Sequence, residues 1–237
     1  MNTQNLSKEF LYQGFALILS IILVHAFYVS VVRPEAASII QEQQAMIEQD
    51  INYVPERSFY VIVRDFEQEA CFILMLWAFA IMTLKAQSSI NERRLLQEDL
   101  IPIREGQSIK PEDSKDFLRQ LENLPESKRQ LLLPRILMNG LKRFSTTKNV
   151  QDVSTSTHTM VESEADRLES ELSMIRYIAW AIPSIGFIGT VRGIGAALSL
   201  AHRAVDGDIS GVTQNLGVAF NSTFIALLIS IVIMFLV

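Results

Sequence analysis

Residues 181–195 read AIPSIGFIGTVRGIG, a stretch apolar enough to lie in a membrane that nevertheless contains a proline, four glycines, a threonine and an arginine. Gly189 and Gly193 form a GxxxG pair, the spacing at which two helices approach closely in lipid. Because a buried hydroxyl and a charge serve no purpose in an inert anchor, this stretch indicates a membrane helix that forms part of a pathway.

The composition points to a membrane protein. The chain of 237 residues is 49% hydrophobic and 20% charged, with a mean hydropathy of +0.23, and its apolar residues are bunched. The net charge of −5 gives no sign of general nucleic-acid binding. Cys71 is the single cysteine, so it cannot form an internal disulfide, and we expect it to pack as a small apolar residue.

Four apolar runs predict an all-α membrane protein with four transmembrane helices and a helical cytoplasmic insert between spans 2 and 3. The first run, Phe10 to Val32, is too long in its apolar part for a signal peptide, and no cleavage site follows it. The predicted divisions are residues 1–33 with span 1, 34–69 as a periplasmic loop, 70–86 as span 2, 87–174 as the cytoplasmic domain, and 175–237 with spans 3 and 4.

Lysine and arginine set the predicted orientation. Fifteen lie between Lys85 and Arg176, against three from Arg33 to Glu69 and one from His202 to Asn215. By the positive-inside rule the insert and both termini are cytoplasmic. The chain stops at Val237 with no polar flank, so we expect a cytoplasmic tail to follow.

Within the insert, Ser145-Thr-Thr147 is expected to form a turn. A long polar helix from about Val150 is expected to lead into span 3.

Small residues share one face in each of the last two predicted spans. At 100° per residue these faces are Gly186, Thr190, Gly193 and Ala197 in span 3, and Ala219, Thr223, Ala226 and Ser230 in span 4. Interhelical packing is one interpretation, since a threonine hydroxyl can bond its own i−4 carbonyl. Two matched stripes in adjacent spans favour the other interpretation, a pathway lined by Thr190 and Thr223.

Three further residues in the spans are unusual. Arg192 lies about 200° around the helix from Thr190, and a charge at mid-membrane costs about 2.5–3.5 kcal/mol on insertion scales. It must therefore face protein, water or an interfacial partner, and both a functional and an interfacial role stay open. Pro183 removes a backbone hydrogen bond and predicts a kink or a hinge. His25 is the one ionisable group in the first run, where we expect a packed or interfacial residue.

Signals for covalent catalysis are missing. The sequence has no phosphate-binding loop with a lysine, no HExxH and no Cys/His cluster with ligand spacing, so we expect neither an enzyme nor a bound metal or cofactor. None of the predicted spans contains Asp or Glu. If the chain conducts protons, a partner is therefore expected to supply the acid that binds them.

Two segments carry a resemblance to a known family. Residues 182–194, IPSIGFIGTVRGI, and residues 217–228, GVAFNSTFIALL, resemble the MotA/TolQ/ExbB proton-channel family. The likeness covers about 175–237. The four-span layout with a helical insert after span 2 is similar to the flagellar-stator branch.

The resemblance implies a function and partners. It implies the ion-channel subunit of an inner-membrane rotary motor, a homopentamer around a dimer of a single-span subunit like MotB, TolR or ExbD, which carries a membrane Asp. The ion would be H⁺ or Na⁺. Thr190 and Thr223 match the family's pore-facing threonines, and Pro183 matches the proline that stator subunits carry early in this span.

The chain also departs from the family pattern. Energy-transducing members carry a Glu just before the second threonine, where this chain has Val218 and Ala219. The stator charges that touch a flagellar rotor have only a loose counterpart in Arg93, Arg94 and Glu98. Proton stators often lack the threonine of span 3. The ion and the driven process, whether flagellar rotation, outer-membrane energisation, gliding or phage defence, stay open.

Two rivals remain on the sequence. A non-conducting membrane scaffold or signalling subunit would use the same small-residue packing. A solute carrier is weakened because the four spans show no inverted repeat.

Overall fold

The computed structural model describes residues 3–49, 53, 56–102 and 108–237. It is helical, without strands in the described part, and four of its helices are long and apolar enough to cross a membrane. The prediction of an all-α protein with four membrane-spanning helices is therefore confirmed. The chain forms two compact units, Met1–Met82 with Met174–Val237, and Thr83–Ser173. The division falls inside two of the long helices.

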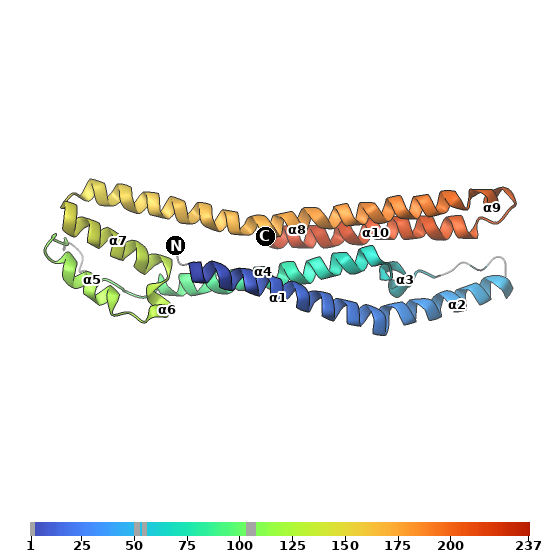
Figure 1. Cartoon of the computed structure of the whole chain (residues 1–237), viewed down its shortest axis with the longest axis horizontal. Coiled ribbons are helices and arrows are strands. Elements are labelled where there is room, and N and C mark those ends of the chain that lie inside the picture. The colour runs from blue at the N-terminus through green and yellow to red at the C-terminus, as the bar shows by residue number, and fades with distance from the viewer. Residues whose placement is uncertain (1–2, 50–52, 54–55, 103–107) are drawn as a thin grey trace. The chain divides into compact units, whose positions relative to one another are not determined.

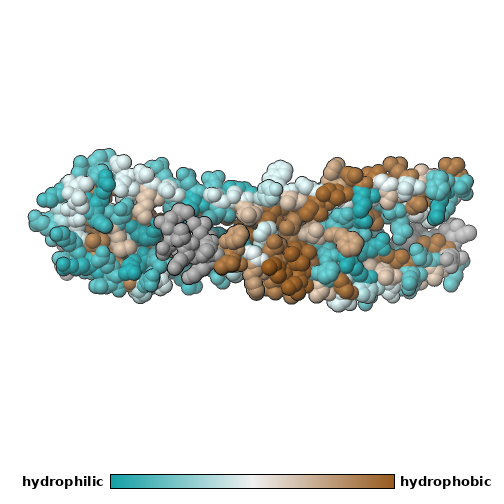
Figure 2. Space-filling view, viewed as in Figure 1, coloured by the Kyte–Doolittle hydropathy of each residue, from teal (hydrophilic) through white to brown (hydrophobic). Residues whose placement is uncertain are grey.

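The first unit holds the apolar helices (Figure 1). They are α1 (Thr3–Phe27), η1 (Tyr28–Val32), α2 (Arg33–Gln49), α3 (Phe59–Val63), the start of α4 (Phe66–Leu95), the end of α8 (Val150–Ser199), α9 (Ala201–Val205) and α10 (Ser210–Leu236). Figure 2 shows apolar side chains gathered over this unit and hydrophilic ones over α5 to α7. Many of its large apolar side chains are exposed in the single chain, as helices that face lipid or a neighbouring subunit require.

The first long helix runs past the end of its apolar run. The backbone stays helical through Arg33 and Pro34 into α2, by way of the five-residue π-helix η1. The N–H of Arg33 bonds the carbonyl of Tyr28, five residues back, which is the wider π register. A π turn loosens the carbonyl ladder where a proline ring would otherwise clash, so Pro34 is accommodated without ending the helix.

The second unit is built from short helices that precede a helical hairpin. It contains the end of α4, α5 (Ser114–Glu122), α6 (Glu126–Arg129), α7 (Leu132–Thr147) and the start of α8. α5 packs against α7. The carboxylate of Glu92 on α4 accepts from the backbone N–H of Leu132 at 3.0 Å and so caps the start of α7.

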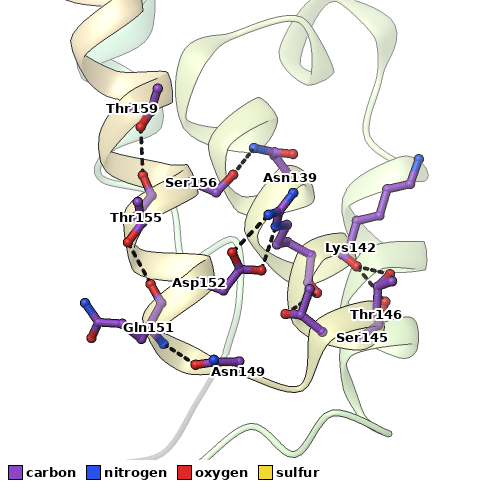
Figure 3. A network of polar contacts seen from close by, with 12 residues as sticks. Asn139, Lys142, Ser145, Thr146, Asn149, Gln151, Asp152, Thr155, Ser156 and Thr159 are labelled. Atoms are coloured by element: carbon purple, nitrogen blue, oxygen red, sulfur yellow. Dashed lines mark hydrogen bonds and ion pairs between the residues drawn. The ribbon is translucent and has the colours of Figure 1, made fainter.

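The predicted turn at Ser145–Thr147 is wrong, whereas the long helix from Val150 is confirmed. α7 instead continues to Thr147, and the three hydroxyls bond carbonyls of the preceding turn, at Lys142 and Arg143 (Figure 3). The chain turns at Lys148, which adopts a left-handed φ of 54°. Across the turn the guanidinium of Arg143 binds the carboxylate of Asp152 through two bonds of 2.8 and 2.9 Å. These bonds lower the pKa of Asp152.

Candidate functional site

The predicted small-residue faces of α8 and α10 lie against each other. A methyl group built on Gly186 would come within 2.4 Å of the Ala226 Cβ, and one on Gly193 within 2.7 Å of the Ala219 Cβ. Ala197, Ala219 and Ala226 are buried. We call this contact the α8–α10 seam. It shows the close helix approach that glycine allows, and it is made within one chain.

Gly189 packs on a second face beside the seam. A Cβ there would meet the Ser222 side chain at 2.5 Å and the Cγ of Glu67 at 3.2 Å. The GxxxG pair therefore serves two contacts. The atoms nearest the built Cβ belong to α10 at Gly193, and to α10 and the start of α4 at Gly189.

Thr190 and Thr223 meet in the middle of the seam, where their hydroxyl oxygens are in direct contact. The Thr190 hydroxyl also reaches the Ala219 carbonyl of α10 at 3.0 Å, and the Thr223 hydroxyl reaches the Gly186 carbonyl of α8 at 3.3 Å. Each threonine can thus donate its proton across the seam, which leaves oxygen lone pairs free to accept. Both side chains are half-buried, so the pair keeps one open side.

Pro183 and Ser230 are linked through one backbone carbonyl. α8 passes through Pro183 without ending. A proline has no N–H, so the carbonyl of Ala179, four residues back, loses its helical partner. The buried hydroxyl of Ser230 on α10 donates to that carbonyl at 2.8 Å. Ser230, the last residue of the small-residue face of α10, therefore supplies the hydrogen bond that the Ala179 carbonyl of α8 loses to Pro183.

Arg192 is paired within the chain. Its Nε lies 2.7 Å from Oε1 of Glu67 and its Nη2 2.8 Å from Oε2, a bidentate pair, and Asp65 lies 3.7 Å away. The Arg192 side chain is 49% exposed, whereas that of Glu67 is 11% exposed. Asp65 precedes α4, where burial raises its pKa and the Arg64 and Arg192 charges oppose that rise. Of the two roles left open for Arg192, the structure shows an ion pair that joins α8 to the start of α4.

Gln68 connects the same turn of α4 to α10. Its side chain is fully buried, and its Nε2 donates to the Ile62 carbonyl at 3.1 Å and to the Ser222 hydroxyl at 3.2 Å. Ser222 in turn donates to the Val218 carbonyl at 2.9 Å. Ser222 directly precedes Thr223, so this contact lies beside the threonine pair.

Glu69 connects α4 to the first long helix. Its side chain is 7% exposed, and its two oxygens accept from His25 Nδ1 at 2.6 Å and Arg33 Nη2 at 2.5 Å. The guanidinium of Arg33 also lies over the rings of Phe66 and Tyr28, at 4.5 and 5.9 Å from their centroids. His25 is therefore a partner of a buried carboxylate rather than an isolated polar residue.

Sequence reasoning missed Glu67, Gln68 and Glu69. The predicted second span begins at Ala70 and contains no acid, because the three residues lie directly before it. The helix begins earlier, at Phe66, with two glutamates in its first turn. The available signal was chemical: acidic residues directly before an apolar run are favourable at a helix N-terminus.

The fold and site define a multi-pass membrane protein with a hydroxyl-lined seam between its last two long helices. Residues 128–237 match the model of the MotA/TolQ/ExbB proton channel family. The family is one of channels and not of enzymes. A search of the curated proteins and a search of the solved structures each find no match. The described residues contain no group of three or more His, Cys, Asp or Glu side chains that could hold a metal ion.

Gly186→Ala tests the packing of the seam. The added methyl would clash with Ala226 and lie 3.0 Å from the Ser222 carbonyl, so we expect a loss of about 1–3 kcal/mol in the free energy of unfolding. The midpoint of thermal unfolding of the purified chain measures it. Gly195→Ala is the matched control, because no atom lies within 4 Å of its added methyl. Adding Ala226→Gly should restore part of the loss, and equal stability of both single variants would contradict the seam.

A charge exchange tests the ion pair. Arg192→Gln leaves the largely enclosed carboxylate of Glu67, 11% exposed, without its bidentate partner, and we expect a loss of about 1–2 kcal/mol, since the arginine is half exposed. The double change Arg192→Glu with Glu67→Arg should recover most of the thermal stability that either reversal alone removes. Arg203→Gln, at an exposed position on α9, is the control. No recovery in the double variant would show that the pair does not join α8 to α4.

Proposed function

We propose that the chain is the ion-channel subunit of an inner-membrane rotary motor that converts ion-motive force into mechanical work. The observation that carries the proposal is the Thr190–Thr223 pair, two hydroxyls in contact within the segment that matches a proton channel family. The hydroxyls can donate to the carbonyls of Ala219 and Gly186. Their lone pairs are then oriented by the backbone to accept from a hydrated H⁺ or to bind Na⁺.

The carboxylates at the start of α4 are engaged in ion pairs within the chain. Glu67 is neutralised by Arg192, and Glu69 by Arg33 with His25 beside it. Each of these carboxylates is thus already paired with a cationic side chain of the same chain. The exchanging acid therefore comes from a partner, and we assign it to the membrane Asp of a single-span subunit like MotB, TolR or ExbD.

If a partner subunit supplies the acid, the chain must work in a complex with that partner. We propose a homopentamer around a dimer of the partner, in the lipid of a bacterial inner membrane, with both termini of the chain in the cytoplasm. Exposed apolar side chains on α8 and α10 supply surface for contacts with neighbouring subunits and lipid. Each ion that crosses yields about 2.3 kcal/mol per 100 mV, which the ring converts into rotation about the partner. In this scheme Pro183 acts as the hinge of α8.

A non-conducting scaffold is the second candidate. The observation that favours it is that the hydroxyls of Thr190, Thr223 and Ser230 all have partners within the chain. In that case the stripes serve only to pack α8 against α10, and the helices of the second unit carry the output.

Replacing the threonines separates the two candidates. With the partner present, Thr223→Ala removes one hydroxyl, and we expect ion flux to fall about tenfold, the effect of losing one hydrogen bond worth about 1.4 kcal/mol at the barrier. Thr223→Ser keeps the hydroxyl and should keep the flux. H⁺ and Na⁺ uptake into vesicles under an imposed potential gives the rates.

Thr213→Ala is the control on the same helix, because Thr213 bonds only carbonyls of its own segment. Undiminished flux in a Thr190→Ala/Thr223→Ala double variant would refute the pore assignment and favour the scaffold.

A further inference from the structure

The first turn of α4 contains a buried hydrogen-bond acceptor, the side-chain oxygen of Gln68, that has no partner among the described residues. The chemistry of its neighbours shows which atom of the amide this is. The Ile62 carbonyl can only accept, so the Gln68 amide must direct its Nε2 toward it at 3.1 Å. Ser222 uses its own proton on Val218 and therefore accepts from the same Nε2. Both amide protons are thereby assigned. Gln68 Oε1 faces the interior and has no hydrogen-bond partner among the described residues.

A second buried polar atom is the hydroxyl of Tyr28, the first residue of η1. The Tyr28 side chain is 2% exposed, and its hydroxyl also has no protein partner in the described part of the chain. Its ring packs on Phe72, with centroids 6.4 Å apart. Phe72 follows Gln68 by one helical turn, so Tyr28 lies against the face of α4 that carries Gln68. The amide oxygen of Gln68 needs a hydrogen-bond donor, and the hydroxyl of Tyr28 needs an acceptor for its proton.

We propose that η1 and the first turn of α4 bound an internal water-binding site, with Gln68 Oε1 and Tyr28 Oη as its ligands. A water molecule donates to the amide oxygen and accepts from the phenol, which satisfies both atoms. Burying either group unpaired carries a desolvation penalty, and that penalty is higher where lipid surrounds the helices. The π register of η1, at whose first residue Tyr28 lies, is a local widening of the kind that often accompanies functional sites.

The site goes beyond the proposed function and does not depend on it. Its readouts need neither the partner subunit nor ion flow. A chain that conducts nothing could still hold this water, and a conducting chain could lack it.

Tyr28→Phe tests the site by the sign of its effect, because it removes the hydroxyl and keeps the ring on Phe72. If the hydroxyl binds water, the midpoint of thermal unfolding should fall by roughly 2 °C or more. If it is unpaired, removing it relieves a desolvation penalty and the midpoint rises. Tyr12→Phe, at a side chain that is 40% exposed on α1, is the matched control and should change little. A rise or no change in Tyr28→Phe overturns the proposal.

A double variant tests whether the two groups share one site. Gln68→Met removes the amide, and Tyr28→Phe in that background should cost less than it does in the native chain, since the water has already lost a ligand. Additive shifts in the unfolding midpoint would assign the two atoms to separate environments and overturn the shared site.

Radiolytic hydroxyl-radical labelling in ¹⁸O-water tests for the water directly in the full chain. Radicals formed from a bound water modify the side chain that it contacts, so Tyr28 should be labelled at a rate comparable with that of Tyr12 despite its burial. Tyr28 labelling about tenfold slower than that of Tyr12 would follow from burial alone and would overturn the proposal.

Discussion

The membrane-spanning unit depends on one constraint, that polar side chains enclosed by apolar helices must find partners inside the protein. The start of α4 meets it by giving each polar side chain a different helix to bind. Glu67 forms an ion pair with Arg192 on α8, and Gln68 donates a hydrogen bond to Ser222 on α10. Glu69 pairs with His25 and Arg33 on the first long helix. A single helical turn thus fixes the positions of all the other long helices of this unit. Their apolar surfaces alone would specify those positions poorly, because apolar contacts have no direction.

The α8–α10 seam also provides hydrogen-bond partners for polar groups, here between two closely packed helices. Two backbones approach because glycines at positions 186 and 193 carry no Cβ, and the carbonyls exposed by this approach become acceptors for threonine hydroxyls. Close packing and polar lining therefore arise from the same residues. The packing and pathway interpretations of the stripes do not exclude each other, since Thr190 and Thr223 are half-buried and keep one side beyond the seam.

Periodicity and hydropathy predicted the helical class, the four spans and the two stripes, because each of these depends on residues close in sequence. The matched composition of the two stripes was only a weak indication that they contact each other. The ion pairs at the start of α4 could not be predicted, since they join residues 44, 36 and 125 positions apart. Arg192 shows the limit most clearly. Its cost in a membrane demanded a partner, but nothing local to α8 could identify Glu67.

The bond from Ser230 to the carbonyl freed by Pro183 has a consequence for motion. A proline usually lets the two halves of a helix bend independently, but here the loosened peptide group is tied to the neighbouring helix. Bending α8 at this point must either break that bond or carry α10 along. As long as the bond is kept, α8 and α10 move together at this point, and the two threonines keep their spacing throughout the movement.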